Sequence, residues 1–272
     1  MNVFQVVGLA AGAWGAAARG VLHPPVREPF LLLCGVHLLL LIGLGYFHAP
    51  ALAPVMEPLV RWLGSEEATH YPEHFWALPE ILRNAELVIA VLLGPLVLGV
   101  ATLRFARGSA AWREAFARMP ALLALGVLGP GLSWTITSLF DLIPLEFTLQ
   151  SFMIRMGLQA AELLLIALVY TSLAYSIAFL LIAGRPLGAA LRGSLQLTAR
   201  LPMPTFLLVG VPLAILFPPT FFMYEMDMGE AGLPPDAVGL LLTARIALQV
   251  IFAALTVGGL THLFMHSTRP ER

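Results

Sequence analysis

The segment Ala237–His266 reads AVGLLLTARIALQVIFAALTVGGLTHLFMH and contains one charged residue, Arg245, in 30 positions. An α-helix needs about 20 apolar residues to cross the roughly 30 Å hydrocarbon core of a bilayer. This segment is therefore long enough to span a membrane. Its excess length is expected to be taken up by tilting or by projection beyond the bilayer.

Five more apolar runs precede this segment. They cover Phe30–Phe47, Asn84–Leu103, Pro120–Phe140, Met156–Ala183 and Pro204–Met223. Each is expected to be a helix, because backbone polar groups in lipid must be satisfied within the chain. The composition agrees, with 59% hydrophobic and 11% charged residues, whereas about a quarter of the residues in soluble domains are charged. We predict an all-α polytopic membrane protein of about six transmembrane helices, forming a single domain over residues 1–272.

The overall charge excludes nucleic acid as an expected partner. The net charge is −1 at pH 7, so the chain has no global basic field. Lysine is absent and all 15 basic residues are arginine. Together with abundant Ala, Gly and Leu, this is typical of a GC-rich bacterial genome, so we expect the bacterial inner (plasma) membrane as the location. The single cysteine, Cys34, leaves no intrachain disulfide possible.

Arginines and acids alternate between the segments that connect the runs. One set of connections holds Arg19, Arg27, Arg104, Arg107, Arg113, Arg118, Arg185, Arg192, Arg200, Arg269 and Arg272. The opposite set holds Glu57, Glu66, Glu67, Glu73, Glu80, Asp141, Glu146, Glu225, Asp227, Glu230 and Asp236. Because cytoplasmic loops are rich in Arg and Lys, both termini are predicted to be cytoplasmic. Ala51-Leu52-Ala53 would suit signal-peptide cleavage, but the long preceding run and Pro54 favour an uncleaved span.

A short motif, Arg-x-Pro with Gly-Val shortly after it, stands before the first, third and fifth runs. The copies are Arg27-Glu28-Pro29 with Gly35-Val36, Arg118-Met119-Pro120 with Gly126-Val127, and Arg200-Leu201-Pro202 with Gly210-Val211. We interpret them as three repeats of a surface helix plus a transmembrane hairpin, with units at about 1–103, 104–183 and 184–272. Chance matching in a chain rich in Ala, Gly and Leu is the alternative.

An amphipathic surface helix is expected at the start of each unit. The first has an apolar stripe of Phe4, Val7, Ala11, Trp14, Ala18 and Val21. Residues 110–119 and 187–201 supply the others. The arginines expected to meet phospholipid headgroups are Arg19, Arg27, Arg113, Arg118, Arg192 and Arg200. These helices are either simple anchors in the lipid bilayer or docking surfaces for a cytoplasmic partner.

Two of these junctions resemble known groups of membrane proteins. Leu103–Val127 (LRFARGSAAWREAFARMPALLALGV) resembles bacterial Yip-type membrane proteins. Gly184–Val211 (GRPLGAALRGSLQLTARLPMPTFLLVGV) is similar to the membrane domain attached to some glycerophosphodiesterases. Each likeness covers a short part of the chain and rests on amphipathicity. It implies the architecture alone, because the phosphodiesterase domain has no counterpart in this sequence.

Ionisable residues inside the runs form one predicted layer. Counted from the cytoplasmic ends, Glu86 lies about 25 Å across, and Glu162 and Arg245 about 31 Å across. Arg155 and Gln159 share a helix face with Glu162, and Gln249 shares one with Arg245. This layer either fixes the bundle through ion pairs and snorkelling arginines or forms a polar cavity, open to the outside, for an anionic or zwitterionic group such as a lipid head.

Three prolines, Pro95, Pro130 and Pro212, fall inside the runs. Each removes a backbone donor and is expected to kink its helix. The kinks serve either helix packing or a transport cycle.

Histidines give weak metal candidates only. His70 and His74 are four apart, but Pro72 lies between them and no third ligand has diagnostic spacing. A segment lying at the membrane interface is the alternative. His262 and His266 suit a helix end near headgroups better than a haem or metal site. His37 is expected to be a buried hydrogen-bonding residue.

The sequence lacks a nucleotide-binding glycine loop, a Ser/His/Asp pattern, an HExxH motif and a zinc pattern. We therefore expect no enzyme activity and no cofactor. The first hypothesis is a membrane-embedded transport or assembly subunit, permease-like or accessory, with a cytoplasmic or membrane protein partner such as an ATPase. The alternative is a stand-alone lipid-handling or membrane-shaping protein. An intramembrane enzyme acting on lipids is the third hypothesis.

Overall fold

A computed structural model describes residues 2–63, 74–108, 111–143, 152–225 and 234–268, and its regular secondary structure in these ranges is helical without a strand. In chain order the helices are α1 (Val3–Val21), α2 (Pro24–Gly45), α3 (Ala53–Leu63), α4 (His74–Leu92), α5 (Gly94–Arg107), α6 (Ala111–Ala117), α7 (Met119–Asp141), α9 (Phe152–Leu173), α10 (Ser176–Leu181), α11 (Leu187–Arg200), α12 (Pro202–Glu225) and α13 (Pro235–Ser267).

Four stretches of helix are long and apolar enough to cross a membrane. They are Pro24–Gly45, Met119–Asp141, Met153–Leu181 and Asp236–Ser267. Two bent pairs raise the number to as many as six if each pair is one span: α4 with α5, bent by 51°, and α11 with α12, bent by 102°. Large apolar side chains such as Leu39, Val127 and Leu240 are exposed on these helices. The molecule is thus all-helical and compatible with an integral membrane protein.

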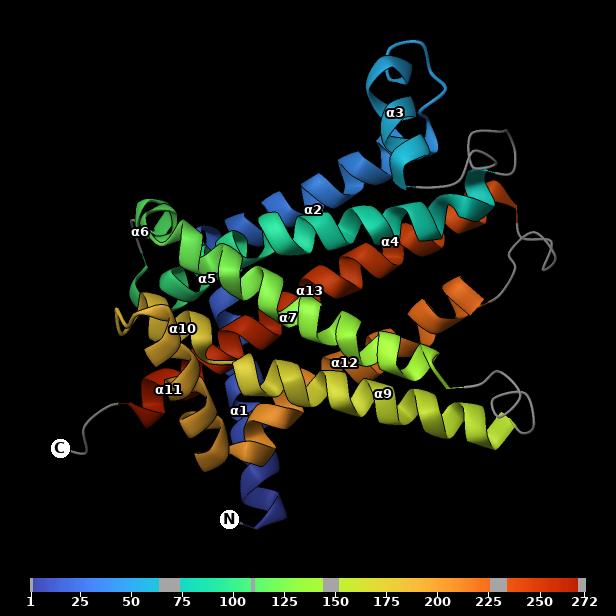
Figure 1. The fold of residues 1–272 in the computed structure, drawn as a ribbon. Coiled ribbons are helices and arrows are strands. Elements are labelled where there is room, and N and C mark those ends of the chain that lie inside the picture. Colours follow the sequence, from blue (N-terminus) through green and yellow to red (C-terminus); the bar gives the residue numbers. More distant parts are fainter. Residues whose placement is uncertain (1, 64–73, 109–110, 144–151, 226–233, 269–272) are drawn as a thin grey trace.

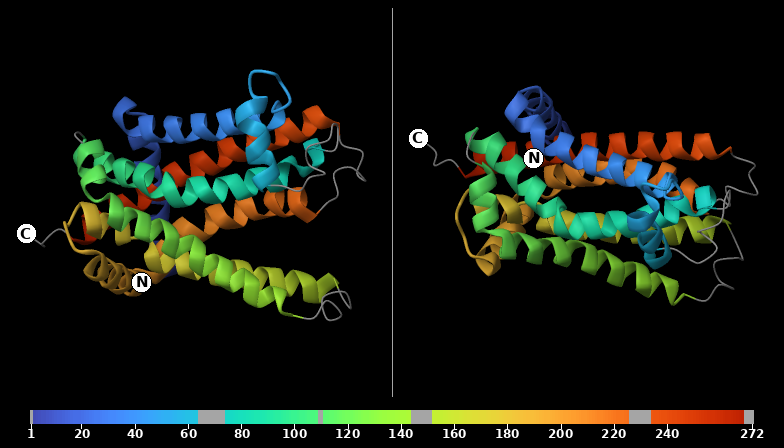
Figure 2. Two further views of the ribbon diagram at one scale, coloured as in Figure 1. Left: turned by 45° about the horizontal axis from the view of Figure 1, so that its top comes forward. Right: turned by 90° about the horizontal axis from the view of Figure 1, so that it is seen from above.

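The long helices lie along one axis of the molecule (Figures 1 and 2). Both termini and the helices α6, α10 and α11 gather at one end, and α3 lies near the other. The end with the two termini is called the arginine end below, because Arg107, Arg118, Arg185 and Arg192 lie there. The opposite end is called the acidic end.

Helix α1 crosses the bundle at the arginine end and packs on α12 and α13. Its capping box joins Asn2 and Gln5: each side chain accepts a hydrogen bond from the backbone N–H of the other. The face turned to the bundle consists of Ala10, Ala13 and Ala17. The stripe expected from Phe4 to Val21 is on a different face, with Phe4 and Val7 exposed beside the buried alanines, so its contact with lipid stays a prediction. Small side chains are buried because they let two helices approach closely.

Glycines on α13 receive this alanine face. A Cβ atom at Gly258 would lie 2.6 Å from Cβ of Ala17. One at Gly259 would lie 3.7 Å from the backbone of Ala13. The other expected surface segments also form helices, α6 over Ala111–Ala117 and α11 over Leu187–Arg200.

The predicted fourth span is interrupted between α9 and α10, at Ala174 and Tyr175. Side chains of α11 satisfy the backbone there. Oγ of Ser194 accepts a hydrogen bond from the Tyr175 N–H at 3.1 Å and donates to the Ser172 carbonyl at 2.7 Å. The Tyr175 hydroxyl lies 2.8 Å from Oγ1 of Thr205 on α12. A break inside an apolar run is tolerated because neighbouring helices supply the missing partners.

Candidate functional site

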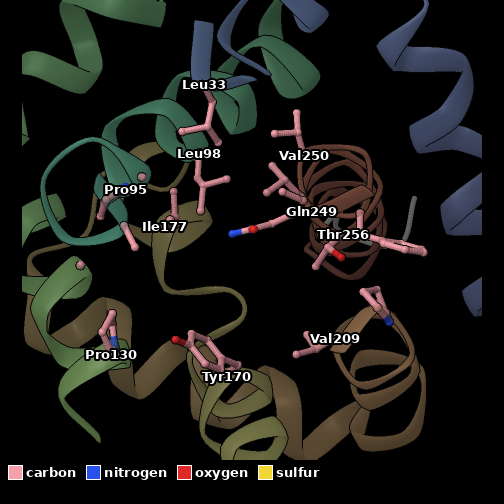
Figure 3. Close-up of a pocket in the computed structure, with 18 of the residues that line it drawn as sticks. Leu33, Pro95, Leu98, Pro130, Tyr170, Ile177, Val209, Gln249, Val250 and Thr256 are labelled. Carbon is pink, nitrogen blue, oxygen red and sulfur yellow. The ribbon is translucent and has the colours of Figure 1, made fainter. Parts of the chain in front are cut away.

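The helix bundle encloses a cavity of about 670 Å³. Helices of all six predicted spans line it: α2, α4 with α5, α7, α9 with α10, α12 and α13 (Figure 3). Most of the lining is apolar, as at Leu33, Leu98, Ile177, Val209 and Val250. The volume falls within the range of small-molecule pockets, about 300–1,000 Å³.

Helix irregularities surround this cavity. The three prolines singled out in the sequence, Pro95, Pro130 and Pro212, all line it. Pro95 follows the break between α4 and α5, and Ala174 lies in the break between α9 and α10. A proline ring clashes with the preceding turn and removes one helical hydrogen bond, which bends a helix. Such a bend is present where α4 and α5 meet at 51°, whereas α7 and α12 continue as helices through Pro130 and Pro212.

A buried ion pair lies at one end of the cavity. Nη2 of Arg245 on α13 donates to Oε2 of Glu86 on α4. The Arg245 and Glu86 side chains are 5% and 12% exposed. The other carboxylate oxygen of Glu86 is buried and has no hydrogen-bond partner among the described residues. Removing two charges from water is costly, so a pair kept at a cavity wall needs a reason beyond stability.

The cavity is elongated, and its charges are at the acidic end. On α13 the lining runs from Arg245 to Thr261, about 24 Å at 1.5 Å per residue. Arg83, one turn before Glu86 on α4, also lines this end. One side of the cavity is therefore ionic at its acidic end and apolar over most of the remaining length.

Single polar side chains interrupt the apolar lining. Gln249 lies one turn after Arg245, its amide reaches into the cavity, and it remains exposed, so the cavity is open (Figure 3). The hydroxyl of Tyr170 also borders the space (Figure 3). His37 is buried, as expected, and its Nδ1 lies 2.8 Å from the Leu33 carbonyl. Oγ of Ser176 is buried and makes no hydrogen bond in the described structure.

The structure divides the predicted charge layer into two groups. Glu86, Arg245 and Gln249 line the cavity. Glu162 on α9 instead accepts a hydrogen bond from Oγ1 of Thr137 on α7 at 2.6 Å. Towards the acidic end α7 and α9 run together and diverge from α4 and α13 (Figures 1 and 2). Equal depth in the bundle therefore does not bring Glu162 to the Glu86–Arg245 pair.

Two further polar residues of α9 also lie outside the cavity lining. Arg155 and Gln159 lie on the same helix and are not in the cavity lining. Both are partly buried, and Oε1 of Gln159 has no partner among the described residues.

The structure describes three of the histidines weighed as metal ligands, His74, His262 and His266. His74 is buried at the start of α4, with Nε2 3.2 Å from the Gly45 carbonyl and its ring against Phe47. His70 lies outside the described residues. The rings of His262 and His266 are 4.4 Å apart between centroids on α13. No group of three His, Cys, Asp or Glu side chains that could hold a metal comes together in the described ranges.

The arginine end contains contacts that the sequence analysis missed. Nη1 of Arg104 on α5 lies 2.6 Å from Oε2 of Glu28 on α2, and Nε1 of Trp112 on α6 donates to the other oxygen at 3.2 Å. Arg107 pairs with Glu114 at 3.2 Å. The sequence could have predicted these ion pairs, because Glu28 and Glu114 are acids in connections that otherwise carry arginines.

The six arginines expected to meet headgroups are all exposed: Arg19, Arg27, Arg113, Arg118, Arg192 and Arg200.

Comparisons with protein-family profiles, curated proteins and solved structures give no match. The account of function therefore depends on the residues and their geometry.

Proposed function

We propose that this chain is an integral membrane protein that binds a lipid-like amphipathic molecule in its central cavity. The observation that carries the proposal is the elongated apolar cavity with the buried Glu86–Arg245 pair at one end. This combination suits a ligand with an apolar body and a charged or strongly polar head.

The apolar body would occupy the length between the pair and the arginine end. Leu98, Ile177, Val209 and Val250 offer hydrocarbon on several sides. Burying an acyl chain there gains about 25 cal/mol per Å² relative to water. The gain is smaller relative to lipid tails, which are already apolar. Selectivity must therefore come from the polar end.

The polar head would lie beside Glu86, Arg245 and Gln249. The Arg245 guanidinium suits a phosphate or carboxylate. The buried second oxygen of Glu86 can accept a hydrogen bond from an ammonium or hydroxyl group. Gln249 adds an amide one turn away. A donor and an acceptor together favour a zwitterionic head or an anionic head with hydroxyl groups.

We further propose six spans arranged as three units, each a surface helix plus a hairpin, in the bacterial inner membrane. Helices α1, α6 and α11 immediately precede α2, α7 and α12, which supports the repeat. The positive-inside rule makes the arginine end, with both termini, cytoplasmic. We also propose that the chain resembles Yip-type proteins and the glycerophosphodiesterase-associated domain in its architecture only. In this orientation the Glu86–Arg245 pair lies towards the outer face.

The proposed activity is binding or movement of the ligand rather than catalysis. Among the described lining residues no nucleophile is hydrogen-bonded to a general base, the arrangement that covalent catalysis needs. Accordingly we propose no cofactor.

The test is a thermal-shift titration of delipidated protein with phospholipids and with an alkane of equal chain length. We expect the phospholipids to raise the melting temperature more than the alkane, and Gln249→Ala to reduce the difference. Equal stabilisation by alkane and phospholipid would show that Glu86, Arg245 and Gln249 do not bind the polar head. No stabilisation by either would contradict the proposal.

A transport or assembly subunit is the second candidate, favoured by the placement of all three prolines around the cavity. Proline bends are natural hinges for alternating exposure of such a cavity. A mild-detergent pull-down read by mass spectrometry tests this alternative. A stoichiometric ATPase or other subunit would favour it, and isolation of the chain with lipid alone would favour the stand-alone protein.

A further inference from the structure

A second pocket, of about 320 Å³, lies at the arginine end. Six residues line it: Arg185, Gly188, Ala189, Arg192, Gly193 and Gln196. All belong to α11 or to the turn before it, and none of them lines the central cavity. We call this feature the α11 pocket.

The α11 pocket holds one arginine in a defined position. The chain turns at Gly184, which has a φ of +66° that favours glycine. The Arg185 N–H then donates to the Phe179 carbonyl at 3.0 Å, and the Arg185 guanidinium lies 4.7 Å from the centroid of the Phe179 ring. Stacking on an aromatic face orients a guanidinium and leaves its edge available.

Gly193 makes room for this arrangement. A Cβ atom there would lie 3.0 Å from Nη1 of Arg185 and 3.1 Å from the Phe179 ring. Both neighbours would have to move by a few tenths of an ångström, so a side chain at Gly193 would shift the guanidinium without changing the charge of the pocket.

The arginines of the α11 pocket differ from several other arginines of the described residues in their partners. Arg61, Arg104, Arg107 and Arg245 all pair with carboxylates. Arg185 and Arg192 have no carboxylate within 4.0 Å in the part of the chain that the structure describes. The Gln196 side chain and the first-turn amides of Gly188 and Ala189 add donors, since the first helical backbone bond runs from Ala190 to Pro186.

From this geometry we propose that the α11 pocket binds the phosphate of an anionic membrane lipid. Guanidinium groups and free amides recognise phosphate oxygens. The source is a lipid because α11 meets the apolar helix α12 at 102°, which places α11 along the membrane surface if α12 spans. Leu195 of α11 is 54% exposed, as expected of a side chain in the interfacial layer.

The test uses delipidated full-length protein in detergent, titrated with phosphatidylglycerol and phosphatidylcholine and read by native mass spectrometry. The wild type is expected to prefer phosphatidylglycerol. R185Q/R192Q is expected to lose about 30-fold of that affinity, which corresponds to about 1 kcal/mol for each of the two surface arginines. The control R200Q removes one charge from the last turn of the same helix, outside the pocket, and is compared with the single variants R185Q and R192Q.

Three results would overturn the proposal. R200Q could lose as much phosphatidylglycerol affinity as R185Q and R192Q lose on average. That result would show that the lipid is attracted by the overall positive charge and not by the pocket. The wild type could bind both lipids equally. Millimolar inorganic phosphate could displace the lipid completely, which would assign the pocket to a soluble phosphate. If the double variant does not fold, G193A replaces it, because G193A keeps both charges and must still weaken phosphatidylglycerol binding.

Discussion

The pairing of Glu86 with Arg245 is the residue-scale feature on which the account depends. The two side chains come from helices far apart in the sequence and are almost fully removed from the surface. A pair in such a position is held by mutual compensation, because each charge alone would be stranded at low dielectric.

Replacing one partner is therefore expected to cost more than replacing both. Glu86→Gln leaves the guanidinium without its counter-charge and should destabilise the protein by about 3 kcal/mol. Glu86→Met with Arg245→Met should recover much of that loss while abolishing the preference for phospholipid over alkane. Melting temperatures and lipid titrations in detergent check both parts. A double variant less stable than Glu86→Gln would show that the two charges do not compensate each other.

The sequence could not predict which charged side chains are in contact with one another. Helical rise placed Glu86, Glu162 and Arg245 at similar depth, and that placement led to one expected network. Depth along a helix does not determine how far apart two helix pairs lie, and towards the acidic end α7 and α9 diverge together from α4. Glu162 accordingly bonds to Thr137, a residue that no sequence pattern distinguished.

At the scale of elements, α7 packs closely on the broken helix pair α4–α5. A Cβ atom at Gly126 would lie 2.5 Å from the Val91 carbonyl oxygen and 2.4 Å from the Pro95 ring. Backbone and proline cannot move aside as the end of a flexible side chain can.

Gly126→Ala is thus expected to destabilise the bundle by about 1–3 kcal/mol, the usual cost of overpacking. The matched control is Gly131→Ala in the same helix, where nothing lies within 4 Å of the added methyl group. Thermal unfolding of both variants in the same detergent compares them. Equal melting temperatures for the two variants would mean that the close approach of α7 to the break is wrong.

The break between α9 and α10 has a similar dependence on α11. Ser194→Ala would leave the Tyr175 N–H and the Ser172 carbonyl without their partner. The expected cost is about 1–3 kcal/mol. Ser172→Ala serves as control, because the Ser172 hydroxyl bonds within its own helix to the Leu168 carbonyl. Hydrogen exchange at Tyr175 should accelerate in Ser194→Ala only; unchanged exchange there would contradict the role of α11.

Sequence patterns predicted most elements and the bend beside Pro95, but they missed the interruption between α9 and α10. The ranges 110–119 and 187–201 correspond to α6 and α11, because amphipathic periodicity and nearby glycine and proline mark their limits. The α9–α10 break has no such mark, since neither Ala174 nor Tyr175 disfavours a helix. It exists because Ser194, distant in sequence, supplies the hydrogen bonds that the helix gives up.

At the scale of the whole molecule, the two ends differ in charge while the middle is apolar. The arginine end carries both termini and the α11 pocket, and the cavity carries its ion pair at the acidic end. If the arginine end is cytoplasmic, single cysteines introduced at Arg27 and Arg192 in a Cys34→Ser background should resist an impermeant thiol reagent in intact cells. A cysteine at Glu57 on α3 should react. The reverse pattern would invert the topology.

The central claim is that the cavity holds a lipid-like molecule. Native mass spectrometry of the purified chain, before and after exhaustive delipidation, tests it with one matched pair of variants. Ala253 lines the cavity, whereas Ala247 on the same helix is exposed and outside it. We expect one tightly retained lipid in the wild type and in Ala247→Phe, and its loss in a folded Ala253→Phe. Equal lipid retention by Ala247→Phe and Ala253→Phe would contradict it.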